Sequence, residues 1–174
     1  MTFDLNAWLA GTQRELKGAP RVNAVVVSRR YEAPIERVWK AWTEGWRSKI
    51  VQGEAKPGET VVLDLGVPKH ITSKILACDA PNLLTATWQY GDTAANPPDE
   101  VSSRLKRDGD GTILELEHRS ETGPAGWAAG VGAGWESGLM TFDYDLRGEP
   151  QSNIPMDTAF PALDAFWTDL EKKR

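Results

Sequence analysis

The sequence predicts an α+β fold, in which a curved antiparallel sheet of about six strands wraps around a long C-terminal helix. Three observations support this prediction. Residues 126–146 place apolar side chains three or four positions apart, which is the spacing of a buried helical stripe. Residues 60–119 contain short segments in which apolar and polar side chains alternate, as in half-buried strands. Short turn-forming links join most of these segments, so neighbouring strands must be antiparallel.

The chain is expected to begin with an amphipathic helix followed by a strand. Residues 3–17 bring four apolar side chains near one helical face, and Gly18 and Pro20 supply the signal that ends a helix. Residues 23–31 alternate over most of their length, which predicts a strand that Pro34 closes.

Two short helices are expected after this first strand. Pro34 suits the first turn of a helix, and Glu36 in that turn matches the positive end of the helix dipole. Gly45 breaks the helix and leaves a short second helical turn over residues 46–50.

Five further strands are predicted in the middle of the chain. They cover residues 60–65, 70–78, 83–90, 101–107 and 112–120. The link at 108–111 reads Asp-Gly-Asp-Gly, a strong hairpin signal, whereas the polar, proline-containing residues 91–100 predict a surface loop.

The long helix is followed by a loop and a final amphipathic helix over residues 157–173. A chain of 174 residues fits one domain. We expect residues 22–147 to form it, with residues 1–21 as an N-terminal helical extension and residues 148–174 as a C-terminal loop and helix packed on the same domain.

The composition argues against several classes of function. A net charge of −5 lacks the concentrated Lys and Arg that phosphate binding requires, so nucleic acid is not an expected partner. No apolar run reaches the roughly 18 residues that span a bilayer. The single Cys78 and the lack of a signal-peptide pattern favour the reducing cytoplasm. Two histidines and one cysteine give no metal-ligand spacing, so neither a metal nor another cofactor is expected.

Four sequence motifs match one known family. They are the Arg-x-Tyr-x-Ala-Pro opening at 29–34, continued by Val38, Trp39, Ala41, Trp42 and Thr43, the Pro-Asn-Leu-Leu run from Pro81 towards Trp88, the Gly-Thr-x-Leu-x-Leu-x-His run at 111–118, and Gly134, Trp135 and Leu139 in the long helix. With these motifs the chain resembles the helix-grip fold of the START-like, birch-pollen-allergen-like (SRPBCC) superfamily. Within that superfamily it resembles the branch named after the activator of heat-shock-protein-90 ATPase homologue. The resemblance implies a cavity between helix and sheet that takes hydrophobic or amphipathic small molecules.

Aromatic and glycine residues supply candidates for the lining of such a cavity. The chain has eight Trp residues, and large rings often line cavities as well as fill cores. The glycines of the long helix either leave room for a ligand or allow close packing. His118 shares a strand face with Leu114 and Leu116, where it could orient a polar group, act as a general base or be hydrogen-bonded within the core. The candidate lining residues are Tyr31, Trp39, Trp42, Leu63, Ile75, Trp88, Tyr90, Leu116, His118, Trp127, Val131, Trp135 and Leu139.

Three hypotheses for the function follow. The first is a non-enzymatic protein that binds a hydrophobic or amphipathic small molecule, such as a lipid or an aromatic compound. The second is a chaperone-associated or regulatory protein-interaction module, which would need a large exposed apolar patch. The third is a cyclase-like or hydrolase-like enzyme acting on a hydrophobic substrate; the sequence shows no clear acid and base pair, so no catalytic residue is assigned. The terminal helices would cap the cavity or mediate a homodimer.

Overall fold

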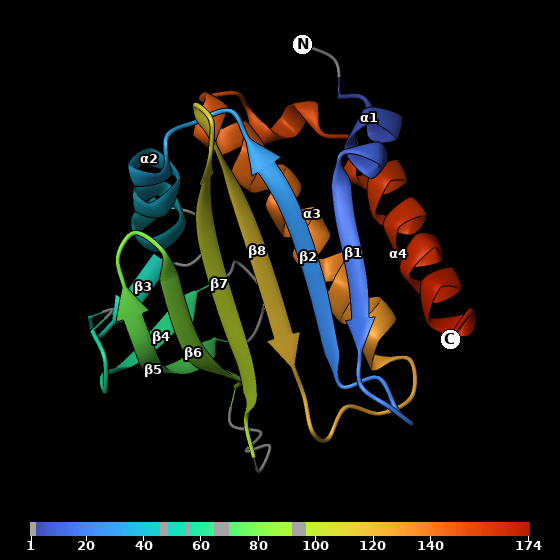
Figure 1. Cartoon of the computed structure of the whole chain (residues 1–174), viewed down its shortest axis with the longest axis horizontal. Helices are drawn as coiled ribbons and strands as arrows, with labels where there is room; N and C mark the ends of the chain where they lie inside the picture. Colours follow the sequence, from blue (N-terminus) through green and yellow to red (C-terminus); the bar gives the residue numbers. More distant parts are fainter. Residues whose placement is uncertain (1–2, 46–48, 55, 65–69, 92–96) are drawn as a thin grey trace.

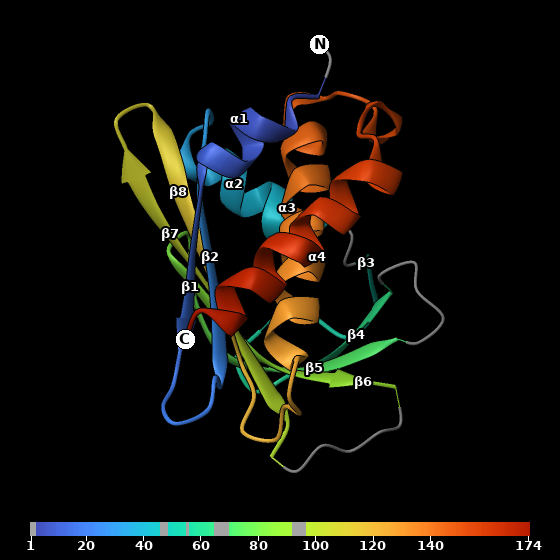
Figure 2. The same ribbon diagram turned by 90° about the vertical axis from the view of Figure 1, so that its right-hand side faces the viewer.

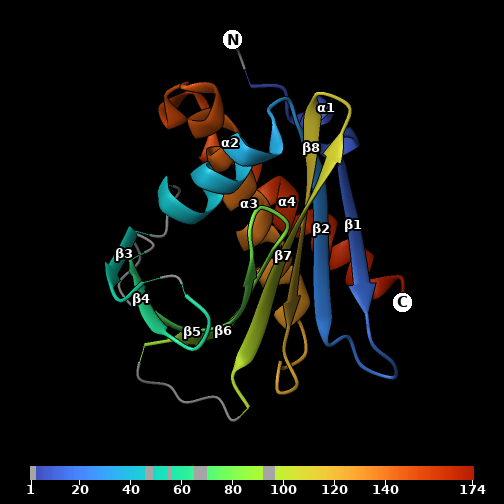
Figure 3. The ribbon, with the colours of Figure 1, turned by 60° about the vertical axis from the view of Figure 1, so that its left-hand side comes forward.

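A curved antiparallel sheet is the main element of the computed structural model, which describes residues 3–45, 49–54, 56–64, 70–91 and 97–174 (Figure 1). Its strands are β1 (Thr12–Lys17), β2 (Ala24–Tyr31), β3 (Lys49–Gln52), β4 (Thr60–Asp64), β5 (Ile71–Asp79), β6 (Leu83–Tyr90), β7 (Asp99–Asp108) and β8 (Gly111–Arg119). Within the described ranges these eight strands form one sheet in the order β1-β2-β8-β7-β6-β5-β4-β3. The sheet bends, so that β3 to β6 lie at an angle to the long strands (Figure 3).

The helices lie on the inner side of this bend. They are α1 (Leu5–Ala10), α2 (Ile35–Lys40), the π-helical turn η1 (Ala41–Gly45) that continues α2, α3 (Trp127–Arg147), the 3-10 turn η2 (Gln151–Asn153) and α4 (Met156–Lys172). Helix α3 runs along the inner side of the sheet, and α4 packs across α3 (Figure 2). The predicted α+β, helix-grip arrangement is therefore confirmed, with more strands than expected.

The N-terminal helix is shorter than the sequence predicted. The helical prediction over residues 3–17 is wrong beyond Ala10, because Thr12–Lys17 form β1 and pair antiparallel with β2. Backbone pairing with β2 satisfies the hydrogen-bonding groups that an unpaired edge of β2 would otherwise expose. Thr12, Arg14 and Leu16 then alternate towards the helices, with Thr12 and Leu16 buried.

A second difference concerns the segment after η1. The sequence predicted a helical turn over residues 46–50, but Lys49–Gln52 form β3, which pairs antiparallel with β4. Residues 46–48 lie outside the described residues. Pairing with β4, which makes β3 the edge strand of the sheet, outweighs the local helical preference of a segment this short.

Candidate ligand-binding site

The side chains predicted to line a cavity differ widely in exposure. Tyr31, Trp42, Leu63, Ile75, Trp88, Leu116, His118 and Leu139 are buried, Trp39, Trp127, Val131 and Trp135 are half-buried, and Tyr90 is exposed. Tyr31 and Trp42 each pack edge-to-face on Phe142 of α3, with ring centroids 5.2 Å apart. These two rings therefore belong to the core where β2, η1 and α3 meet.

One side of α3 carries a half-buried apolar stripe. Trp127, Val131 and Trp135 recur every four residues, and each retains some exposure although it packs against the core. Gly134 lies beside this stripe, and a Cβ atom built on it would meet no heavy atom within 4 Å apart from its chain neighbours and the nearby backbone of α3 itself. The stripe thus has open space next to it.

On the opposite side of α3, a glycine allows close packing between helices. A Cβ atom on Gly132 would lie 2.3 Å from Cδ2 of Trp167, whose indole is completely buried against α3. No such contact is possible, so only glycine permits α4 to approach this closely. Of the two reasons expected for the glycines, close packing applies to Gly132 and open space to Gly134.

Three tryptophan rings and His118 form an aromatic cluster between α3 and the sheet. The ring centroids of Trp88 and Trp135 are 4.9 Å apart, and that of His118 lies 5.5 Å from Trp127 and 6.0 Å from Trp135. We call Trp88, Trp127, Trp135 and His118 the indole cluster. It joins β6, β8 and α3, and its two α3 tryptophans are the half-buried ones.

His118 is hydrogen-bonded at both ring nitrogens. Its Nδ1 accepts a hydrogen bond from Nε1 of Trp135 at 2.8 Å, which assigns the ring proton of the neutral imidazole to Nε2. Nε2 then donates to Oδ2 of Asp99 at 3.0 Å. Since neither nitrogen is open to a ligand, the geometry favours a histidine that orients Trp135 over one that acts as a general base.

Asp99 completes this chain of contacts. Burial alone would raise the pKa of its carboxyl, but hydrogen bonds from His118 and Ser120 hold that pKa below its ordinary value. Because the pKa is lower in the folded than in the unfolded state, the ionised carboxylate stabilises the fold at neutral pH. That contribution is lost as the pH falls through the folded-state pKa.

His118→Phe should lower the free energy of unfolding by about 1–3 kcal/mol, measured by urea denaturation. The phenyl ring keeps the aromatic packing but leaves Nε1 of Trp135 without its acceptor, and the carboxylate of Asp99 keeps only its hydrogen bond with Ser120. Trp135→Phe in the His118→Phe background should then cost less than Trp135→Phe alone, because the lost donor no longer has an acceptor. Strictly additive effects would contradict the hydrogen-bonded arrangement.

Two buried polar atoms near the indole cluster have no hydrogen-bond partner within the described residues. They are Oγ of Ser73 on β5 and Nε1 of Trp88 on β6. Ser73 was absent from the predicted lining residues, although its alternation with Ile71 and Ile75 already placed it on the buried face. The sequence feature that could have identified Ser73 was a serine between two isoleucines on one face of a predicted strand.

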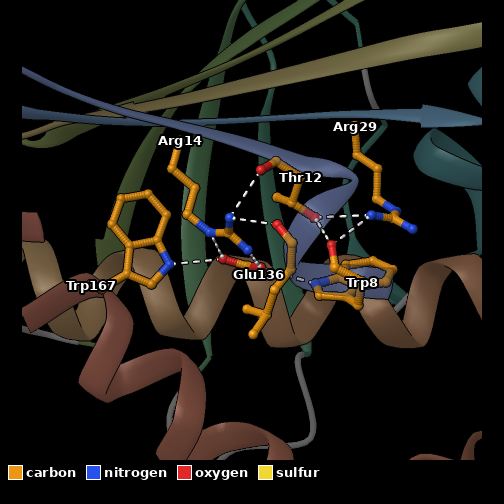
Figure 4. A network of polar contacts seen from close by, with 7 residues as sticks. Trp8, Thr12, Arg14, Arg29, Glu136 and Trp167 are labelled. Atoms are coloured by element: carbon orange, nitrogen blue, oxygen red, sulfur yellow. Dashed lines mark hydrogen bonds and ion pairs between the residues drawn. The ribbon is translucent and has the colours of Figure 1, made fainter. Parts of the chain in front are cut away.

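A second polar arrangement lies at the terminal segments (Figure 4). The buried carboxylate of Glu136 accepts hydrogen bonds from Nε1 of Trp8 and Nε1 of Trp167, each at 2.9 Å, and from Nε of Arg14 at 2.8 Å. Nη2 of Arg14 donates to it as well. We call Glu136, Trp8, Arg14 and Trp167 the Glu136 clasp. With four donors its carboxylate is saturated, which favours a structural role in joining α1, β1 and α4 to α3.

Other types of site find little support in the described ranges. There, no group of three or more His, Cys, Asp or Glu side chains is placed to hold a metal ion. Among the same residues, every helix is too short or too polar to span a membrane.

A bent antiparallel sheet around a long C-terminal helix defines a helix-grip protein. The chain belongs to the family described as activator of Hsp90 ATPase homolog 1-like protein, within the SRPBCC superfamily; the family model matches residues 32–143. The predicted family is therefore confirmed. No curated protein sequence matches the chain.

Solved structures of CalU16 from Micromonospora echinospora resemble more than nine-tenths of the chain. The crystal structure has a TM-score of 0.74 and 30% identity, and the match covers 92% of this chain and 98% of CalU16. The solution structure has a TM-score of 0.73 and 27% identity, covering 93% and 96%. DynU16, from the dynemicin biosynthetic locus, shares the fold with a TM-score of 0.67 and 20% identity, over 75% of this chain and 49% of DynU16. The likeness to CalU16 extends well beyond residues 32–143, so it includes much of the terminal segments.

Proposed function

We propose that the protein binds a hydrophobic or amphipathic small molecule between α3 and the inner face of β4 to β6, without catalysis. The observation that carries this proposal is the half-buried stripe of Trp127, Val131 and Trp135 beside the open position of Gly134. Half-buried indoles in the interior of a curved sheet suit a ligand that completes their burial. The fold of this family typically binds hydrophobic ligands, which agrees with the proposal.

The alternatives receive less support from the described residues. For an enzyme, His118 and Asp99 are the titratable pair at the indole cluster, and they are engaged with each other and with Trp135. For a protein-interaction module, the exposed large apolar side chains are Leu76, Tyr90, Phe160 and Phe166, spread over β5, β6 and α4. Six positions separate the two phenylalanines, so they point to different sides of α4. These side chains do not share one element face.

The test uses diphenylmethane, an apolar compound with two aromatic rings, as a probe. Binding is followed through the indole ¹⁵N–¹H resonances of the tryptophans, and native mass spectrometry of the purified protein shows any small molecule already held. We expect saturable shifts for Trp88, Trp127 and Trp135. Gly134→Leu should weaken binding at least tenfold, because the new side chain fills the open position.

Gly130→Leu is the matched control. It lies one turn earlier on α3 and has equally open surroundings, but Gly130 is exposed whereas Gly134 is half-buried. A leucine at position 130 should therefore stay in solvent and leave binding unchanged. If diphenylmethane and a panel of lipids and aromatic compounds give no saturable shift, and no molecule is held by the purified protein, the proposed function is wrong.

A further inference from the structure

Two of the buried polar atoms without a partner are cross-strand neighbours on the inner face of the sheet. Ser73 is 1% exposed and Trp88 is 9% exposed, yet Oγ of the first and Nε1 of the second have no hydrogen-bond partner in the described part of the chain. A buried donor left unpaired loses its hydrogen bond to water without gaining another, so most buried polar groups in folded proteins are paired. Two such unpaired atoms on neighbouring residues suggest that a bound molecule supplies their hydrogen-bond partner.

The register of the sheet brings the two side chains together. Val61 on β4 pairs with Ser73, and Trp88 pairs with Asp99 on β7. Thr72 pairs with Gln89 and Ile75 with Ala86, which sets Ser73 directly opposite Trp88. The inner faces of β4 to β7 therefore carry one row: Val61, Ser73, Trp88 and Asp99. Its central two members hold the unpaired atoms.

The acceptor opposite Trp88 on the sheet, the carboxylate of Asp99, is already hydrogen-bonded to His118 and not to Trp88. The carboxylate of Asp99 faces His118, which leaves the indole N–H of Trp88 unpaired although the two residues are opposite each other. The Trp88 ring packs on Trp135 with centroids 4.9 Å apart, so its orientation is fixed by the indole cluster. The ring that carries the unpaired N–H thus packs against one of the half-buried tryptophans of the proposed site.

The chemistry of these atoms specifies what they can bind. An indole N–H only donates, whereas a hydroxyl donates or accepts, so the pair can offer two donors to one acceptor atom. The inner-face cations Arg14 and Arg29 lie on β1 and β2, at the other end of the sheet, and both bond within the chain. A neutral acceptor therefore suits this position better than an anion.

We propose that Ser73 and Trp88 anchor the ligand through a neutral acceptor oxygen, so that the ligand class is aromatic ketones and similar aromatic compounds with a carbonyl. The proposal rests on the proposed function, because it assigns the polar anchor of the same site. The aromatic part packs on the indole cluster, and the carbonyl oxygen accepts hydrogen bonds from Oγ of Ser73 and Nε1 of Trp88. This pairing explains why two buried donors remain unsatisfied in the chain itself.

The test compares benzophenone with diphenylmethane, which have the same two rings and differ by a carbonyl in place of a methylene. The quantity measured is the ratio of their dissociation constants in each variant. Comparing this ratio between a variant and the wild type cancels the difference in hydrophobicity between the two probes. We expect Ser73→Ala to shift this ratio against benzophenone by about five- to tenfold, and Trp88→Phe to shift it in the same direction. Diphenylmethane affinity should change little in Ser73→Ala.

Ser102→Ala is the matched control for the serine. Ser102 is also buried in the sheet, but its hydroxyl is paired with Oγ1 of Thr85, 3.0 Å away. This variant should leave the ratio unchanged. In the wild type, benzophenone should also move the Trp88 indole proton downfield more than diphenylmethane does.

The outcomes separate the two proposals. If both probes bind and Ser73→Ala leaves the ratio unchanged, the anchor is wrong while the proposed function stands. If neither probe binds the wild type, the anchor is wrong; the proposed function fails with it when the panel of lipids and aromatic compounds also gives no saturable shift and the purified protein holds no molecule. Ser73→Ala should fold as stably as the wild type, because it removes an unpaired hydroxyl and no hydrogen bond.

Discussion

Glu136→Ala should lower the free energy of unfolding by about 3–5 kcal/mol, because it breaks a buried ion pair from one side. The side chain of Arg14 is 5% exposed and that of Glu136 is completely buried. Without the carboxylate, the guanidinium keeps its charge in the interior, and the indole N–H groups of Trp8 and Trp167 lose their acceptor. Urea denaturation followed by circular dichroism measures the change.

Glu36→Ala is the control for this prediction. Glu36 also pairs with an arginine, Arg107, but both side chains are 62% exposed. Water and salt screen such a pair, so its removal should leave the unfolding midpoint nearly unchanged. Equal effects of the two substitutions would mean that the Glu136 clasp contributes no more to stability than a surface ion pair.

Gly132→Ala should destabilise the protein by about 1–3 kcal/mol, even though alanine favours helices over glycine. Its Cβ would overlap the indole of Trp167. That indole cannot turn aside cheaply, since it is fully buried and its Nε1 is hydrogen-bonded to Glu136. Helix α4 must therefore move away from α3.

Gly134→Ala is the matched comparison, two positions further along the same helix. Apart from its chain neighbours and the nearby backbone of α3, no atom lies within 4 Å of the added methyl group, so the gain in helix propensity should raise the free energy of unfolding by about 0.5–1 kcal/mol. Chemical denaturation of both variants gives the two values under the same conditions. A similar decrease in the free energy of unfolding for both variants would show that the two sides of α3 are equally packed.

The parts of the fold that the sequence predicted well are those in which apolar side chains follow the period of the element. The stripe of α3 and the alternation of Ile71, Ser73 and Ile75 in β5 are of this kind. Strand β1 is the counterexample. Two of its three inward side chains are Thr12 and Arg14, so no apolar alternation marks it. Arg14 is stabilised there by a carboxylate 122 positions away, which local sequence cannot reveal.

The same limit applies to the candidate site. Tyr31 and Trp135 both belong to patterns that point inward, but Tyr31 is 1% exposed against Phe142 while Trp135 stays half-buried. Which inward ring is covered by the protein depends on where the sheet bends relative to α3. That is a property of the whole fold, so sequence patterns identified candidate rings without separating the core from the proposed site.

The Glu136 clasp also bears on the order in which the chain can complete its fold during synthesis. Trp8 and Arg14 leave the ribosome more than 120 residues before Glu136, and Trp167 follows Glu136 by 31 residues. Until residue 136 has emerged, β1 can pair with β2, but Arg14 lacks the carboxylate that binds it in the folded protein. Trp167 on α4 is the last donor to be synthesised, so the Glu136 clasp is complete only after α4 has emerged.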